Sequence, residues 1–234
     1  MTCWSFTRNI ILVLSSLALT GLQSFNENLN TYITKDVIIK NDLVNIQELD
    51  PTIIVELKYS TTDNFMNMDV YGDLEICYLR KAPAQMLVEA HTSLKGSYPN
   101  LRLLVYDGLR PRSIQWELWK TLVDVPEAER TQFVADPRSG SIHNFGAAVD
   151  LTLADSSGNP LDMGTKYDYF GELAFPALED SLLTIGQLTN KQISNRHILR
   201  KIMQDAGFSP ITTEWWHFDA FPYQVTKSKY EIIE

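Results

Sequence analysis

The spacing of hydrophobic residues along this chain alternates between a helical and a strand-like period. Residues 84–95 and 113–122 carry apolar side chains every three or four positions, which predicts two amphipathic helices. Residues 193–206 show the same period and are followed by Gly207, a residue typical of a helix C-terminus. We therefore expect at least three helices.

Four other segments have the composition of strands. β-Branched residues dominate residues 52–59, and residues 101–107 form an apolar run that ends at Gly108. Polar and apolar side chains alternate around Asp150, which predicts a strand with one face turned to the core. Aromatic residues favour a short strand within 215–218. Helices and strands do not alternate regularly, which favours an α+β fold over a doubly wound one.

Length and composition are those of one folded domain. A chain of 234 residues can bury one sizeable core, and a hydrophobic fraction of 44% with 21% charged residues is ordinary for a globular protein. Lys and Arg number 20 against 29 Asp and Glu, which gives a net charge of −9. Because no basic patch stands out, we expect no nucleic-acid partner.

The N-terminal segment has the pattern of a secretory signal peptide. Arg8 is the only charge before the apolar run of residues 10–22, and this run of about 13 residues is shorter than the roughly 20 that span a bilayer. We expect a signal peptide at 1–24, a polar leader at 25–44 and the domain at 45–234. The mature protein would then be periplasmic or secreted, without a membrane span. An uncleaved membrane anchor is the alternative.

Cys77 and two of the four histidines are expected to be structural. Cys77 is alone outside the predicted signal, so it cannot form an intramolecular disulfide, and its apolar neighbours predict a buried side chain. His91 and His197 lie within helical patterns and are expected to be core residues with satisfied hydrogen bonds.

The other two histidines lie in the segments that carry most of the chemistry, 141–150 and 214–217. These read Ser-Ile-His-Asn-Phe-Gly-Ala-Ala-Val-Asp and Glu-Trp-Trp-His. A catalytic zinc site uses three protein ligands and keeps one position open for water. We predict that His143, Asp150 and His217 are these ligands; iron(II) binds to similar ones.

Two more residues fit a hydrolase. Such a site needs a base to collect a proton from water, and Glu214 lies close in sequence to the third predicted ligand without being one. Arg110 follows a buried strand and is held by Pro111, so it is expected to project into a cleft and face an oxyanion or a substrate carboxylate. A surface arginine in a turn is the alternative.

The two motif segments resemble those of D-alanyl-D-alanine dipeptidases of the vancomycin-resistance type. These are zinc peptidases of family M15, related to D,D-carboxypeptidases and to the hedgehog signalling domain. The segments around Tyr59 and Arg110, and residues 162–168 and 195–207, resemble family segments in the same order. The similarity spans roughly residues 45–220.

The resemblance implies a single α+β domain with a central antiparallel sheet flanked by helices, and one zinc ion per chain. It assigns seven residues to the site: the zinc ligands His143, Asp150 and His217, the base and acid Glu214, the oxyanion-stabilising Arg110, and the pocket residues Ser141 and Tyr59.

The reaction implied is hydrolysis of D-Ala-D-Ala to two D-alanines. A D,D-carboxypeptidase that trims peptidoglycan stem peptides would use the same metal and base, so it remains an alternative. A metal-containing binding module without turnover is a third possibility, as the hedgehog resemblance allows. The presence of both Glu214 and Arg110 favours an enzyme over such a module.

Overall fold

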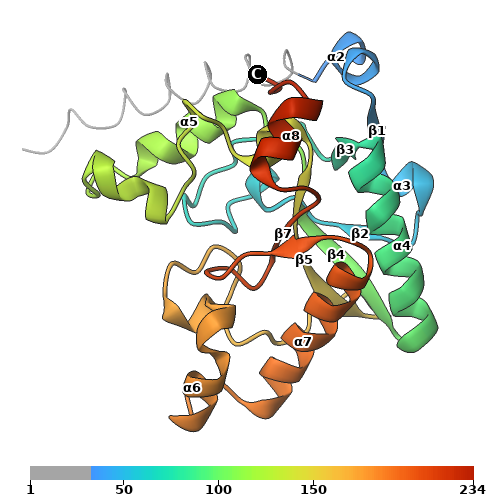
Figure 1. The fold of residues 1–234 in the computed structure, drawn as a ribbon, viewed down its shortest axis with the longest axis vertical. Coiled ribbons are helices and arrows are strands. Elements are labelled where there is room, and N and C mark those ends of the chain that lie inside the picture. Colours follow the sequence, from blue (N-terminus) through green and yellow to red (C-terminus); the bar gives the residue numbers. More distant parts are fainter. Residues whose placement is uncertain (1–32) are drawn as a thin grey trace, which may run out of the picture.

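The computed structural model of the protein describes residues 33–234, so the predicted signal peptide lies outside the described part. Figure 1 shows a single mixed domain in which helices surround a central sheet. Within residues 33–234, no helix is both long and apolar enough to cross a membrane. The predicted α+β fold class is confirmed.

The central sheet has five strands in the order β2-β4-β5-β7-β6. They are β2 (Ile54–Val55), β4 (Leu101–Asp107), β5 (Ala148–Asp155), β6 (Ser209–Pro210) and β7 (His217–Asp219). The sheet is antiparallel, as expected, except that β2 runs parallel to β4. A separate antiparallel pair joins β1 (Leu43–Asn45) to β3 (Tyr78–Arg80).

Two long helices cover one face of the central sheet (Figure 1). Helix α4 (Lys81–Ser97) packs against β4, and α7 (Asn190–Asp205) packs against β5 and against α4. Their apolar sides and the strand residues facing them form the main core, which includes Leu87 and Leu94 of α4 and Val105 of β4. The predicted helices at 84–95 and 193–206 are confirmed, because an amphipathic stripe is buried by a single face of the sheet.

Shorter helices complete the fold. The α-helices are α2 (Lys35–Lys40), α3 (Ile46–Leu49), α5 (Arg112–Thr121), α6 (Glu179–Thr184) and α8 (Tyr223–Lys229). The 3-10 helices are η1 (Lys58–Ser60), η2 (Glu127–Gln132), η3 (Ile142–Phe145), η4 (Glu172–Ala174) and η5 (Pro176–Leu178). Helix α5 matches the expected helix at 113–122 within one residue at each end.

Two segments differ from the sequence-based expectation. Residues expected to form a polar leader carry α2 and β1, and Leu43 is buried, so the expected boundary at residue 45 falls inside β1. The strand expected at 52–59 is reduced to β2, because backbone bonds from Ser60 to Leu57 and from Thr61 to Lys58 close the turn of η1. That turn places Tyr59 beside the candidate site.

Candidate active site and metal centre

A capped 3-10 turn, η3, carries His143. The hydroxyl of Ser141 accepts a hydrogen bond from the His143 backbone N–H over 3.3 Å, and the Asn144 side chain accepts one from the Ser141 N–H over 2.7 Å. Gly146 then ends the turn at φ 70°, in the left-handed region that favours glycine. This local sequence directs the chain from His143 into β5.

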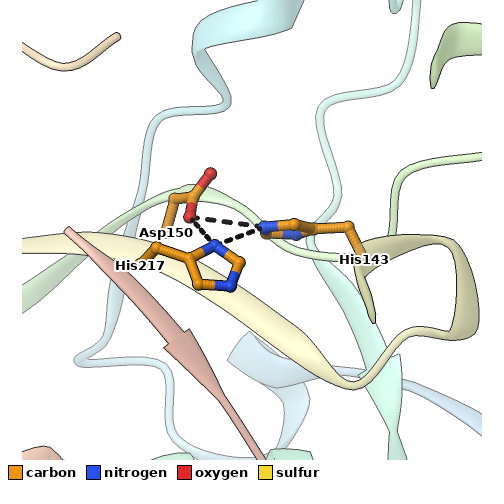
Figure 2. Close-up of side chains that lie close together, drawn as sticks. All are labelled: His143, Asp150 and His217. Carbon is orange, nitrogen blue, oxygen red and sulfur yellow. Dashed lines mark hydrogen bonds and ion pairs between the residues drawn. The ribbon is translucent and has the colours of Figure 1, made fainter. Parts of the chain in front are cut away.

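Asp150 and His217 face each other across neighbouring strands. The antiparallel register of β5 and β7 pairs these two residues directly, so their side chains lie on the same face of the sheet. Asp150 Oδ1 lies 2.9 Å from His217 Nδ1 and 3.3 Å from His143 Nε2, and the two ring nitrogens are 3.1 Å apart (Figure 2). The structure therefore brings together all three predicted ligands.

In both His143 and His217, the ring nitrogen that points away from Asp150 forms a hydrogen bond to an acceptor oxygen. His143 Nδ1 lies 2.7 Å from the carbonyl oxygen of Gly108, and His217 Nε2 lies 2.8 Å from Asp219 Oδ1. Because a carbonyl or carboxylate oxygen only accepts hydrogen bonds, these nitrogens carry the ring protons. In the neutral rings, the inward nitrogens thus point bare lone pairs at the Asp150 carboxylate, the arrangement typical of metal-ligating histidines.

This donor set fits a metal ion. Three ligands each about 2.0 Å from one tetrahedral ion are roughly 3.3 Å apart, close to the separations seen here. Burial alone would raise the pKa of Asp150, but the two histidines lower it well below its usual value. Burial alone would lower the pKa of His217, but Asp150 and Asp219 raise it well above. These shifts show that the Asp150 carboxylate stabilises a positive charge beside it. Asp150, His143 and His217 can therefore hold a metal ion.

Arg110 is fixed beside these groups by a buried carboxylate. Its Nε and one terminal nitrogen donate to Asp107 Oδ2 over 2.9 and 2.6 Å, and the other terminal nitrogen donates to Gln115 over 3.0 Å. Asp107 is fully buried and also accepts from the Tyr71 hydroxyl over 2.7 Å. The guanidinium lies 3.6 Å from Asp150 Oδ2. Arg110 therefore lines the site in a single orientation and is not a surface residue.

A cavity of about 300 Å³ opens beside the cluster and is also lined by Glu214. Among the described residues, no hydrogen bond or ion pair ties down the half-buried Glu214 carboxylate. Burial raises the pKa of Glu214; His217 opposes this rise and Asp150 adds to it. A carboxylate without a partner and with a raised pKa is suited to exchange protons.

Ser141 and Tyr59 line the same cavity, as predicted. The ring of Tyr59 lies under the Arg110 guanidinium, 5.0 Å from its central carbon, and the Tyr59 hydroxyl donates to Asp168 over 3.2 Å. Asp168 also lines the cavity. Burial, together with the charge of Asp150, raises the pKa of Asp168 well above its usual value.

Comparison with known proteins shows which family this chain belongs to. Residues 39–232 match the peptidase M15 family model described as D-ala-D-ala dipeptidase. The chain belongs to this family. The resemblance inferred from the two motif segments is thereby confirmed, and the family is one of peptidases.

Individual relatives of this dipeptidase family cover most of the chain. The D-alanyl-D-alanine dipeptidase of Escherichia coli K12 is 35% identical over 76% of this chain and 84% of the relative. That of Enterococcus faecalis is 27% identical over 83% of this chain and 100% of the relative. Among solved structures, the LD-carboxypeptidase LdcB aligns with 80% of this chain and 71% of its own, at 18% identity and a TM-score of 0.42.

In this member of the dipeptidase family, the sequence pattern did not reveal the residues that hold the predicted site residues in place. Asp219 lies two positions after His217 and one residue beyond the strand expected within 215–218; on β7 this spacing puts both side chains on one face, and it could have indicated Asp219. Asp107 lies three positions before Arg110 in the same turn. Gly108 contributes only a backbone carbonyl, for which the sequence gives no signal.

The remaining histidines and Cys77 lie away from the site. His91 is buried and accepts a hydrogen bond from the Leu103 backbone N–H over 3.3 Å, which confirms a structural role. His197 was expected in the core, but it lies exposed on α7, 3.3 Å from Glu179. The helical period places it on the outer face. Cys77 is buried, as expected, and it is a free cysteine within the described part of the chain.

Proposed function

We propose that this protein hydrolyses the dipeptide D-Ala-D-Ala to two D-alanines at a zinc site. The observation that carries the proposal is the convergence of His143, Asp150 and His217 at the edge of a cavity that Glu214 and Arg110 also line. The curated relatives named above are D-alanyl-D-alanine dipeptidases, which supports the choice of substrate.

His143 Nε2, Asp150 Oδ1 and His217 Nδ1 would hold one zinc ion per chain. A set of two imidazoles and one carboxylate suits zinc by ligand type. A bound zinc ion would supply a Lewis acid for the scissile carbonyl and lower the pKa of a water molecule.

Glu214 would move the protons. Its carboxylate accepts a proton from the attacking water and then donates it to the nitrogen of the leaving D-alanine. Within residues 33–234, no hydrogen bond or ion pair engages the Glu214 carboxylate, so its oxygens are available for both transfers. The pKa raised by burial makes the carboxylate a stronger base than an exposed glutamate.

Arg110 would stabilise the negative charge that develops on the carbonyl oxygen. Two hydrogen bonds to Asp107 Oδ2 hold the guanidinium before the substrate arrives, so little reorganisation is needed during the reaction. Burial of both partners strengthens the interaction with a developing anion.

Ser141, Tyr59 and Asp168 would form the substrate wall. A free dipeptide carries an ammonium group next to the bond to be cleaved, and the Asp168 carboxyl is a charge partner for it within the cavity. Burial raises the pKa of Asp168, and a substrate ammonium group beside it would lower that pKa again. Binding of the substrate and ionisation of the Asp168 carboxyl would therefore favour each other.

The deciding experiment compares two substrates on purified, zinc-loaded protein. We expect a higher kcat/KM for free D-Ala-D-Ala than for a pentapeptide that ends in D-Ala-D-Ala. The Glu214→Gln variant, with zinc content measured, serves as the control for contaminating peptidases. Preference for the pentapeptide would instead support the D,D-carboxypeptidase alternative, and failure to cleave either would contradict the proposal.

We also propose export of the protein to the periplasm or the medium. The support is the apolar run of residues 10–22 behind Arg8, which suits a cleaved signal peptide. Mass spectrometry of the N-terminus after expression and cell fractionation tests this. An intact N-terminus in the membrane fraction would favour the uncleaved anchor.

A further inference from the structure

The two oxygens of the buried Asp150 carboxylate have different neighbours. Oδ1 faces the two histidine rings, whereas Oδ2 accepts a hydrogen bond from the Tyr167 hydroxyl over 2.9 Å. The Arg110 guanidinium also approaches Oδ2 but stops at 3.6 Å, beyond hydrogen-bond distance. The closest partner of Oδ2 is therefore a neutral donor, although a cation lies next to it.

Aromatic packing aims the Tyr167 hydroxyl. The ring of Tyr167 contacts the rings of Tyr106, Trp216 and Tyr59, with centroids 5.3, 5.5 and 6.1 Å away. These neighbours come from three separate parts of the chain, so the ring is fixed from several sides. Its hydroxyl has little freedom to leave Asp150.

The loop that carries Tyr167 is itself anchored to α7. Asn195 donates from its side chain to the Asp162 carbonyl over 2.9 Å, and Arg196 donates from Nε to the Met163 carbonyl over 2.7 Å. Both side chains are almost fully buried on α7. These bonds connect the helix to the loop and, through Tyr167, to Asp150.

We propose that Tyr167 is a positioning residue of the metal centre, which orients the Asp150 carboxylate so that Oδ1 faces the ion. A neutral hydroxyl on Oδ2 withdraws less of the carboxylate charge from the metal than a direct hydrogen bond from Arg110 would. Asp107 and Gln115 hold the Arg110 guanidinium 3.6 Å from Oδ2, so Tyr167 remains the closest partner of that oxygen. This inference rests on the proposed metal site.

The test is the Tyr167→Phe variant, which removes one hydroxyl and keeps the ring. Tyr106→Phe is the matched control: Tyr106 is buried against Tyr167, and its hydroxyl has no hydrogen bond among the described residues. We expect the zinc dissociation constant, measured by competition with a chromophoric chelator, to rise about 10- to 100-fold in Tyr167→Phe and by less than about twofold in Tyr106→Phe.

A second readout follows the coordination itself. The visible absorption spectrum of the cobalt(II)-loaded protein should change in Tyr167→Phe, as the carboxylate reorients, and stay unchanged in Tyr106→Phe. Unchanged zinc affinity in Tyr167→Phe, or an equal loss in both variants, would overturn the inference. So would a metal-free Tyr167→Phe protein that melts well below the wild type, because the role would then be general stability. If the wild type itself binds no zinc, the proposed function fails instead.

Discussion

Asp219 accepts a hydrogen bond from His217 Nε2 over 2.8 Å, and both residues belong to the same short strand, β7. The bond fixes the ring so that Nδ1 faces Asp150 and His143. It also makes the ring a better ligand, because a carboxylate partner raises the basicity of the imidazole. The side chain that holds His217 is thus supplied by its own strand.

We predict that Asp219→Ala weakens zinc binding by about 10- to 100-fold, and that Asp219→Asn has a smaller effect because the amide oxygen still accepts the bond. Competition with a chelator measures both constants. Asp124→Ala, at an exposed position, is the control and should bind zinc as the wild type does. Equal affinity in Asp219→Ala and wild type would show that the bond does not support the site.

The acidic side of the pH profile of kcat/KM should reflect the pKa of Glu214. Its pKa is raised by burial, and it must be deprotonated to act as the base, so kcat/KM should fall as the pH drops through a value above the ordinary glutamate pKa of about 4.3. A pH profile of kcat/KM measures this. A limb at or below the ordinary value would contradict the assignment.

Replacing Glu214 by Gln should separate metal binding from turnover. We expect kcat to fall by about 10²- to 10⁴-fold, while the protein still takes up one zinc ion. Steady-state kinetics and metal analysis of the same preparation provide both values. Retained turnover would refute Glu214 as the base.

Arg110→Lys keeps the charge but loses the planar fork that Asp107 holds. We expect kcat to fall by about 10²- to 10³-fold with little change in zinc affinity, because the developing oxyanion loses a fixed donor. Kinetics with D-Ala-D-Ala and a zinc titration test this. A change in KM alone would instead assign Arg110 to substrate binding.

Gly108 supplies the carbonyl that holds His143, and its position leaves no room for a side chain. A Cβ there would lie 2.5 Å from Cys77 Sγ and 3.0 Å from the Tyr78 carbonyl oxygen. We predict that Gly108→Ala lowers the free energy of unfolding by about 1–3 kcal/mol in urea denaturation.

Two further variants make this prediction sharper. Gly96→Ala, in α4 with no atom within 4 Å of the new Cβ, should instead stabilise the protein by about 0.5–1 kcal/mol. Combining Gly108→Ala with Cys77→Ala should cost less than the sum of the two single changes, by at least about 0.5 kcal/mol. Strict additivity would show that the clash with Cys77 is not the cause.

Sequence pattern was sufficient where burial alone sets the residue types. The helices ending near residues 95 and 206 were predicted because burial on one side imposes a regular apolar period, and the strand at 101–107 because burial of both faces gives a continuous apolar run. The stretch at 52–59 was predicted as one strand. Its β-branched residues do not reveal that the 3-10 helix η1 begins at residue 58. That turn depends on backbone bonds within the fold.

The sequence by itself determined the candidate chemistry of this protein: the residue types of the two motif segments indicate three metal ligands and a base, and the turn after the strand at 101–107 adds an arginine. Only the tertiary structure decided how these groups are held. Register places Asp150 opposite His217, and partners distant in sequence, Gly108 and Tyr167, fix the orientation of His143 and Asp150. Such contacts arise from packing between strands and loops, which a local pattern of residues does not encode.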